Sequence, residues 1–183
     1  MRSSPRSLPT ILPLLVLVLA CGDIQAPEAT ADESISALRA EGTVATRSPV
    51  FNTHLTGAEE VPPVDTNAQG QAVFRLSADG TQLSYRLIAS NIVDVLMAHI
   101  HMAPAGVNGG IVVWLYPEAP PPQLIPGQHN GILATGVITA ENLVGALAGA
   151  TIADLVAAIE AGNTYVNVHT SANPGGEIRG QLQ

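Results

Sequence analysis

The segment Val95-Leu96-Met97-Ala98-His99-Ile100-His101-Met102 alternates between two sets of side chains. One set is uniformly apolar and consists of Leu96, Ala98, Ile100 and Met102. The other set carries His99 and His101, two residues apart. Because residues i and i+2 of a strand lie on one face, about 6.5–7 Å apart at the backbone, the pattern predicts a β-strand. Its apolar face should contact the core, and both histidines should lie on the opposite, outer or rim face.

Similar short runs continue from Pro49 to the end of the chain, punctuated by Gly, Pro and Asn. This texture is typical of an antiparallel all-β domain, which we expect over residues 49–183. We predict strands over residues 50–56, 70–77, 82–89, 95–102, 111–116, 132–139, 163–170 and 177–182. The proline-rich residues 116–131 should form a long surface loop. The expected architecture is an antiparallel Greek-key β-sandwich.

A short helical insertion is expected between the last strands. Thr151, with Asp154 three residues later, resembles a capping box, and Gly162 supplies a C-terminal stop. A second helix is expected over residues 140–147, with Thr139 as its cap.

A second histidine follows the same alternation near the C-terminus. Tyr165, Asn167 and His169 alternate with Val166 and Val168. If this strand neighbours the first one, the imidazoles of His99, His101 and His169 can meet. Three neutral imidazoles suit Zn²⁺ or Cu²⁺, so these residues form a candidate site for copper or zinc.

The fourth ligand of such a site is left open, with water, Glu177 and His54 as candidates. The competing interpretation is structural, with the histidines forming hydrogen bonds to backbone groups at the turn over residues 173–176. Glu177 and Arg179 also lie two residues apart, and a cross-strand or buried ion pair is the favoured interpretation for them. His129, in the proline-rich stretch, is a weaker candidate ligand.

Three motifs carry a family resemblance: residues 55–64 (LTGAEEVPPV), 98–110 (AHIHMAPAGVNGG) and 165–182 (YVNVHTSANPGGEIRGQL). In this order they resemble the chordin-type (CHRD) domain, which is widespread in bacterial secreted proteins. The resemblance covers residues 50–183. It implies an immunoglobulin-like sandwich, although a sandwich like that of copper/zinc superoxide dismutase satisfies the same strand pattern. It supplies no catalytic residues.

The N-terminus is typical of a secreted lipoprotein. Arg2 and Arg6 precede a short apolar stretch over residues 8–20, which is too short to span a bilayer comfortably. The sequence Val18-Leu19-Ala20-Cys21 resembles a bacterial lipobox. We therefore predict a lipoprotein signal peptide over residues 1–20, a lipid on Cys21 and a flexible tether over residues 21–48. The alternatives are an ordinary signal peptide or an uncleaved anchor.

The composition of the chain limits the classes of partner that it can bind. The formal net charge is −8, and the chain contains no lysine. It has no basic stripe to follow phosphates, so nucleic-acid binding is excluded, and attraction to anionic lipid headgroups is disfavoured. Cys21 is the only cysteine, so a disulfide or a thiolate zinc site is not expected. Membrane attachment would therefore depend on the lipid alone.

These observations favour a non-enzymatic, lipid-anchored extracytoplasmic β-domain that acts as a binding or structural module at a bacterial cell envelope, either in the periplasm or on the cell surface. The alternative is a copper- or zinc-binding periplasmic protein that uses His99, His101 and His169. An enzyme similar to superoxide dismutase is the least favoured hypothesis. Five histidines in all and no evident bridging ligand leave a dinuclear site unbuilt.

Overall fold

The computed structural model describes residues 48–183. The predicted signal peptide, the lipidation site Cys21 and nearly all of the tether lie outside the described residues. Within 48–183, no helix combines the length and the apolar character that a membrane crossing requires.

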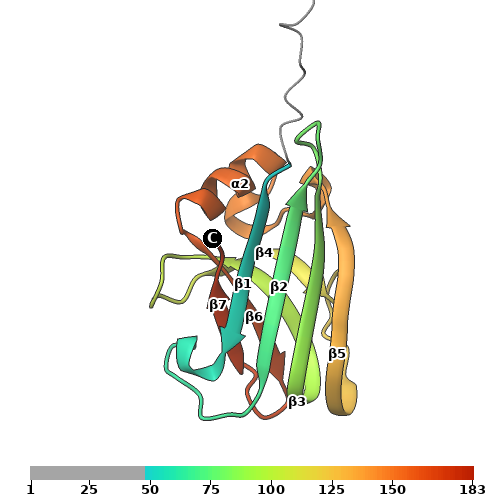
Figure 1. Ribbon diagram of the computed structural model, residues 1–183, viewed down its shortest axis with the longest axis vertical. Coiled ribbons are helices and arrows are strands. Elements are labelled where there is room, and N and C mark those ends of the chain that lie inside the picture. Colours follow the sequence, from blue (N-terminus) through green and yellow to red (C-terminus); the bar gives the residue numbers. More distant parts are fainter. Residues whose placement is uncertain (1–47) are drawn as a thin grey trace, which may run out of the picture. The chain divides into compact units, whose positions relative to one another are not determined.

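Seven strands and one α-helix form the domain (Figure 1). The strands are β1 (Val50–Thr56), β2 (Gln69–Leu76), β3 (Leu83–Met102), β4 (Gly110–Tyr116), β5 (Ile125–Ile138), β6 (Thr164–Thr170) and β7 (Ile178–Gln181). The helix is α2 (Ile152–Glu160), and the 3-10 turns are η2 (Gly57–Glu59), η3 (Ala140–Asn142) and η4 (Gly145–Leu147). The all-β, antiparallel class predicted from the sequence is confirmed.

Strand β3 organises the fold because it is 20 residues long and takes part in two pairings on each side. Its first half pairs with β2 and β5, and its second half pairs with β4 and β6. The sequence predicted two strands with a break between them. The chain instead continues through the break, with Asn91 and Asp94 at positive φ (56° and 52°) and shifts in register against β5. Such bulges bend a strand without ending it.

The sheet closes on itself, so the predicted Greek-key sandwich of two separate sheets is corrected to a single barrel-like sheet. The hydrogen-bonded order runs β2-β1-β7-β6-β3, and β3 pairs again with β2. The physical reason is the bend in β3, because one bent strand joins the two sheets that the predicted sandwich would have kept separate. Strands β4 and β5 pair with β3 outside this ring.

The predicted loop over residues 116–131 is also corrected, because β5 already begins at Ile125. Pro126 is tolerated there because β5 lies at an edge and pairs with β3 alone. The helix predicted over residues 140–147 is wrong as well. The backbone becomes extended at Leu143 (φ −77°, ψ 127°), which separates η3 from η4.

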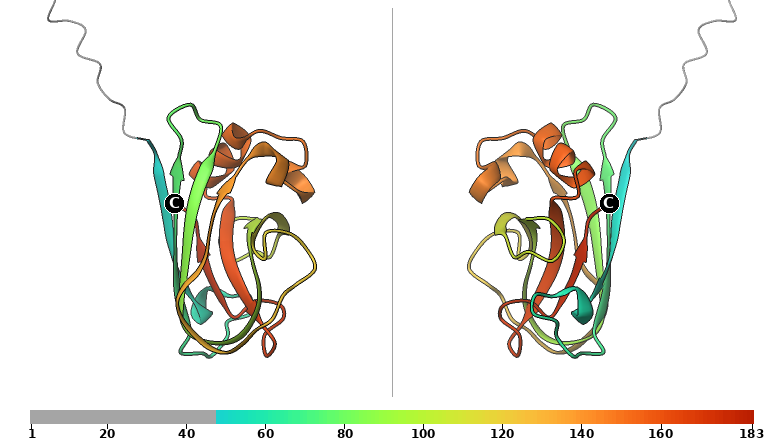
Figure 2. Two further views of the ribbon diagram at one scale, coloured as in Figure 1. Left: turned by 90° about the vertical axis from the view of Figure 1, so that its right-hand side faces the viewer. Right: turned by 90° about the vertical axis from the view of Figure 1, so that its left-hand side faces the viewer.

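The core fills the inside of the sheet and one of its ends. Its fully buried side chains include Phe74, Leu87, Ile100, Leu115 and Ile178. Helix α2 adds Ile152, Leu155 and Ile159 at the end where β1 begins (Figures 1 and 2). The capping box is present as predicted: Thr151 Oγ1 accepts from the Asp154 amide, and the Asp154 carboxylate accepts from the Thr151 amide.

Candidate metal site

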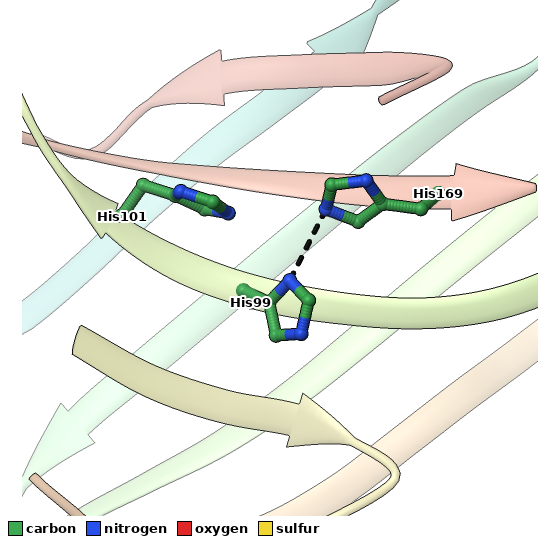
Figure 3. Close-up of side chains that lie close together, drawn as sticks. All are labelled: His99, His101 and His169. Carbon is green, nitrogen blue, oxygen red and sulfur yellow. Dashed lines mark hydrogen bonds between the residues drawn. The ribbon is translucent and has the colours of Figure 1, made fainter. Parts of the chain in front are cut away.

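Strands β3 and β6 are antiparallel neighbours, and their register brings the three histidines together. His99 lies opposite Asn167, and His101 lies opposite Tyr165, so His169 follows two residues along on the same face. One ring nitrogen from each of His99, His101 and His169 lies within 4.8 Å of the other two (Figure 3). The convergence that the sequence left conditional on strand adjacency is therefore present.

The histidines are buried, which corrects the expected outer or rim position. Their exposed fractions are 0% for His99, 7% for His101 and 5% for His169. They do lie on the strand face opposite the core residues Ala98 and Ile100, as the alternation predicted. That face is covered by aromatic rings and by loops that bond the imidazoles.

Two aromatic side chains pack directly on the cluster. Trp114 of β4 meets the ring of His99 edge to face, at 4.2 Å between centroids. Tyr165 stacks on His101 at 4.9 Å and 10°. Neither contact was anticipated from the sequence, because alternation gives the face on which a side chain lies but not its partner on the neighbouring strand.

Two of the imidazoles are oriented by backbone carbonyl groups. Nδ1 of His101 lies 2.9 Å from the Gly109 carbonyl oxygen, and Nδ1 of His169 lies 2.9 Å from the Pro174 carbonyl oxygen. A carbonyl oxygen can only accept, so in the neutral ring Nδ1 carries the proton and Nε2 keeps the lone pair. Metal-binding histidines are held in this way by a carbonyl or carboxylate behind the ring.

The third imidazole, His99, directs its Nδ1 at Nε2 of His169, 3.1 Å away (Figure 3). Without an ion, this pair is a hydrogen bond in which His99 donates. With an ion, both nitrogens would be ligands. Two nitrogens at 2.0–2.1 Å from one metal, at angles between square and tetrahedral, are separated by about 2.9–3.4 Å. The observed spacing fits either state.

Some polar atoms of the site have no protein partner. Nε2 of His101, Nε2 of His99 and Oδ1 of Asn167 are buried without a hydrogen bond. The His101 atom points toward the other two rings (Figure 3). A buried polar atom without a partner costs about 1–3 kcal/mol, so an acceptor aimed into the cluster favours a ligand there.

Burial keeps all three imidazoles neutral. It lowers the pKa of His99 to about 3, with a further lowering from His169 and His101. It lowers the pKa of His169 to about 4, although the Pro174 hydrogen bond opposes the shift. Burial also lowers the pKa of His101, against the Gly109 hydrogen bond. At neutral pH the three rings can therefore bind a metal without net loss of a proton, although His99 must move its proton from Nδ1 to Nε2 if Nδ1 is the ligand.

The other candidate ligands lie elsewhere. His54 is exposed on β1, and His129 is on β5 opposite Ile92. The Glu177 carboxylate accepts from the hydroxyl groups of Thr66 (2.8 Å) and Thr170 (2.6 Å). Neither His54 nor Glu177 joins the cluster of three histidines, so a fourth position would be left to water or to an added ligand.

The predicted pairing of Glu177 with Arg179 is wrong. Arg179 donates to the Asn108 side chain (3.0 Å) and the Val107 carbonyl (2.9 Å). Its guanidinium carbon also lies 3.4 Å from the centre of the Tyr165 ring. The two side chains are two residues apart in sequence, but Glu177 is bonded by Thr66 and Thr170, whereas Arg179 is bonded by Val107 and Asn108.

The structure thus defines a small antiparallel β-domain with a buried cluster of three neutral imidazoles. Residues 51–182 match the CHRD domain family, and the chain belongs to that family. Membership suggests an extracellular binding or structural module. Comparison with curated proteins and with solved structures gave no match.

Proposed function

We propose that this protein is a copper- or zinc-binding module of the bacterial cell envelope, with His99, His101 and His169 as its ligands. The observation that carries the proposal is the orientation of the rings. Carbonyl groups hold Nδ1 of His101 and His169, so both present an Nε2 lone pair to the space that His99 also faces.

A scaffolding role explains this arrangement less well. A structural histidine gains most when both ring nitrogens have partners, because each unsatisfied buried group is costly. Here Nδ1 of His101 has a hydrogen-bond partner, the Gly109 carbonyl oxygen, whereas Nε2 of the same ring has none. A metal ion would use that lone pair. Once the ring proton of His99 moves from Nδ1 to Nε2, the ion would also replace the single hydrogen bond between His99 and His169 with two coordinate bonds.

The donor set favours copper and zinc over harder ions. Imidazole nitrogen suits Zn²⁺ and Cu²⁺, whereas Ca²⁺ and Mg²⁺ require oxygen ligands. The three imidazoles would supply the protein ligands and leave one position for water or another donor. We propose metal binding alone as the function of these rings.

The metal content of the purified protein tests this function. After exposure to Cu²⁺ or Zn²⁺ and desalting, we expect about one metal ion per chain by mass spectrometry. The His99→Ala/His101→Ala variant should retain none, whereas the matched control His54→Ala should retain the full amount, because His54 is exposed on β1. Equal uptake by all three proteins, or none by any, would reject the site. Partners at the envelope would then become the leading function.

The lipid anchor is a separate part of the proposal, supported by the lipobox ending at Cys21. In the bacterial host, Cys21→Ser should move the protein from the membrane fraction to the soluble fraction. Continued sedimentation with the membranes would contradict lipid anchoring. Metal uptake should be the same in both forms, since Cys21 lies outside the residues that form the histidine cluster.

A further inference from the structure

Arg179 is the most unusual charged residue near the histidine cluster. It has an exposed fraction of 1% and is among the largest fully buried side chains. Its guanidinium group donates to two neutral acceptors, the Asn108 side chain and the Val107 carbonyl, and covers the face of Tyr165. Burying a charge costs free energy unless the charged group is well hydrogen-bonded. We therefore ask what the buried guanidinium group of Arg179 does in this position.

Both hydrogen bonds of Arg179 go to one loop, residues 103–109, which joins β3 to β4. The loop itself is weakly held. Its one internal backbone hydrogen bond joins the Val107 amide to the Pro104 carbonyl, and residues 104–108 are exposed. Asn108 adds a bond to the Val61 carbonyl at 2.6 Å. Side chains, more than the loop's own backbone, therefore fix its position.

The end of this loop touches the metal site. The Gly109 carbonyl accepts from Nδ1 of His101, and the Gly109 amide donates to the Tyr165 hydroxyl at 3.2 Å. Gly109 also packs so tightly that an added Cβ would collide with the Met102 carbonyl oxygen. A continuous set of contacts thus runs from Arg179 through Asn108 and Gly109 to the ring of His101.

A second route reaches the same ring. Tyr165 contacts both residues: the guanidinium carbon of Arg179 lies 3.4 Å from the centre of its ring, and the ring of His101 stacks at 4.9 Å between centroids. A cation over an aromatic face is attracted by the ring quadrupole, and the stack fixes the plane of the next ring. The plane of His101 and the position of its carbonyl acceptor therefore depend on the same guanidinium group.

We infer that Arg179 is a positioning residue for the histidine cluster: by holding the loop at Val107 and Asn108, it keeps the Gly109 carbonyl against Nδ1 of His101 and so directs the Nε2 lone pair inward. His169 provides an internal comparison, because its acceptor Pro174 belongs to a different loop. The effect on metal affinity rests on the proposed function, whereas the effect on the tautomer of His101 does not.

The tautomers can be measured in the metal-free protein by long-range ¹H–¹⁵N correlation of the imidazole nitrogens. We expect wild type to show His101 and His169 with the proton on Nδ1. Asn108→Ala removes an acceptor of Arg179 from an exposed loop position and should leave the fold intact. It should produce a measurable Nε2–H population at His101 and none at His169. Arg179→Lys should produce the same change, and the double variant should add little to either.

The matched control is Asn163→Ala, at an exposed loop position outside the contacts of Arg179. An unchanged His101 tautomer in a folded Asn108→Ala protein would overturn the inference, as would an equal change at His169. If Arg179→Lys fails to fold, Asn108→Ala alone decides.

Zn²⁺ titration of Asn108→Ala should show an affinity for Zn²⁺ about 10-fold weaker than that of wild type, the usual effect of removing a hydrogen-bond partner behind a metal ligand. A shifted tautomer with no metal binding even in wild type would reject the metal function and leave the positioning role intact.

Discussion

Excess Cu²⁺ or Zn²⁺, at a free concentration of about 100 times its Kd, should raise the midpoint temperature of unfolding of the wild-type protein by about 5–10 °C. The three ligands converge only in the folded chain, because His99 and His169 are 70 residues apart in sequence. A ligand that binds only the folded state at 100 times its Kd adds about 2.7 kcal/mol to the free energy of unfolding. For a domain of this size each kcal/mol shifts the midpoint by about 3 °C. Thermal unfolding followed by circular dichroism, with and without metal, measures the shift.

The comparison that matters is the shift caused by metal, not the stability of each variant alone. His99→Ala/His101→Ala removes two buried rings and should be less stable than wild type even without metal. Its midpoint should nevertheless be unchanged on adding metal. His54→Ala should keep the whole shift. A shift that survives in the double variant would place the bound ion elsewhere in the chain.

The sequence predicted the local elements well where alternation was uninterrupted. Strands β1, β4 and β6 begin within one residue of their predicted starts. It failed at β3, where Ser90, Asn91 and Asp94 resemble a turn. Asn and Asp tolerate positive φ, so the same residues that favour a turn also allow a bulge inside a long strand. The choice between them depends on partners supplied by distant strands.

The predicted break in β3 also explains why the predicted sandwich is wrong. Two separate strands lead naturally to two sheets, and so to a sandwich. One bent strand that pairs with β2 at its start and with β6 at its end closes the sheet instead. Pairing between distant strands is not encoded in local periodicity, which fixes only the face on which each side chain lies.

For the histidine site, the sequence likewise predicted the faces of the side chains but not their surroundings. Period-2 alternation correctly placed His99 and His101 on one face and His169 on the matching face of its own strand. Their burial was missed, because the covering groups come from Trp114, Tyr165 and two loops. The acceptors behind the rings are backbone carbonyls, which leave no mark in the sequence. The one available signal was Gly109, whose lack of a side chain permits the close approach of its loop to Met102.

The metal-free protein should lose stability as the pH falls from about 6.5 toward 4. In the folded state the pKa of His99 is about 3 and that of His169 about 4, below the usual value of 6.5. The unfolded chain therefore binds more protons throughout this interval, and the free energy of unfolding must rise with pH. The stabilising contribution is fully present above pH 6.5 and is lost progressively below it. At pH 5 the loss is roughly 2 kcal/mol for each of the two imidazoles.

Glu60 acts in the opposite direction and has to be separated from the histidines. Burial raises the pKa of its carboxyl group from 4.5 to about 7, despite the nearby charge of Arg179. The folded state therefore holds an extra proton between these values, which favours folding as the pH falls from about 7 to 4.5. Urea unfolding at pH 7.5 and pH 5.0, with a chelator present, should consequently show a steeper loss in Glu60→Gln than in wild type. His99→Gln should show a shallower loss, and exposed His54→Ala should leave the wild-type difference unchanged. Parallel losses in Glu60→Gln, His99→Gln and wild type would mean that neither the buried carboxyl nor the buried imidazole controls the response to acid.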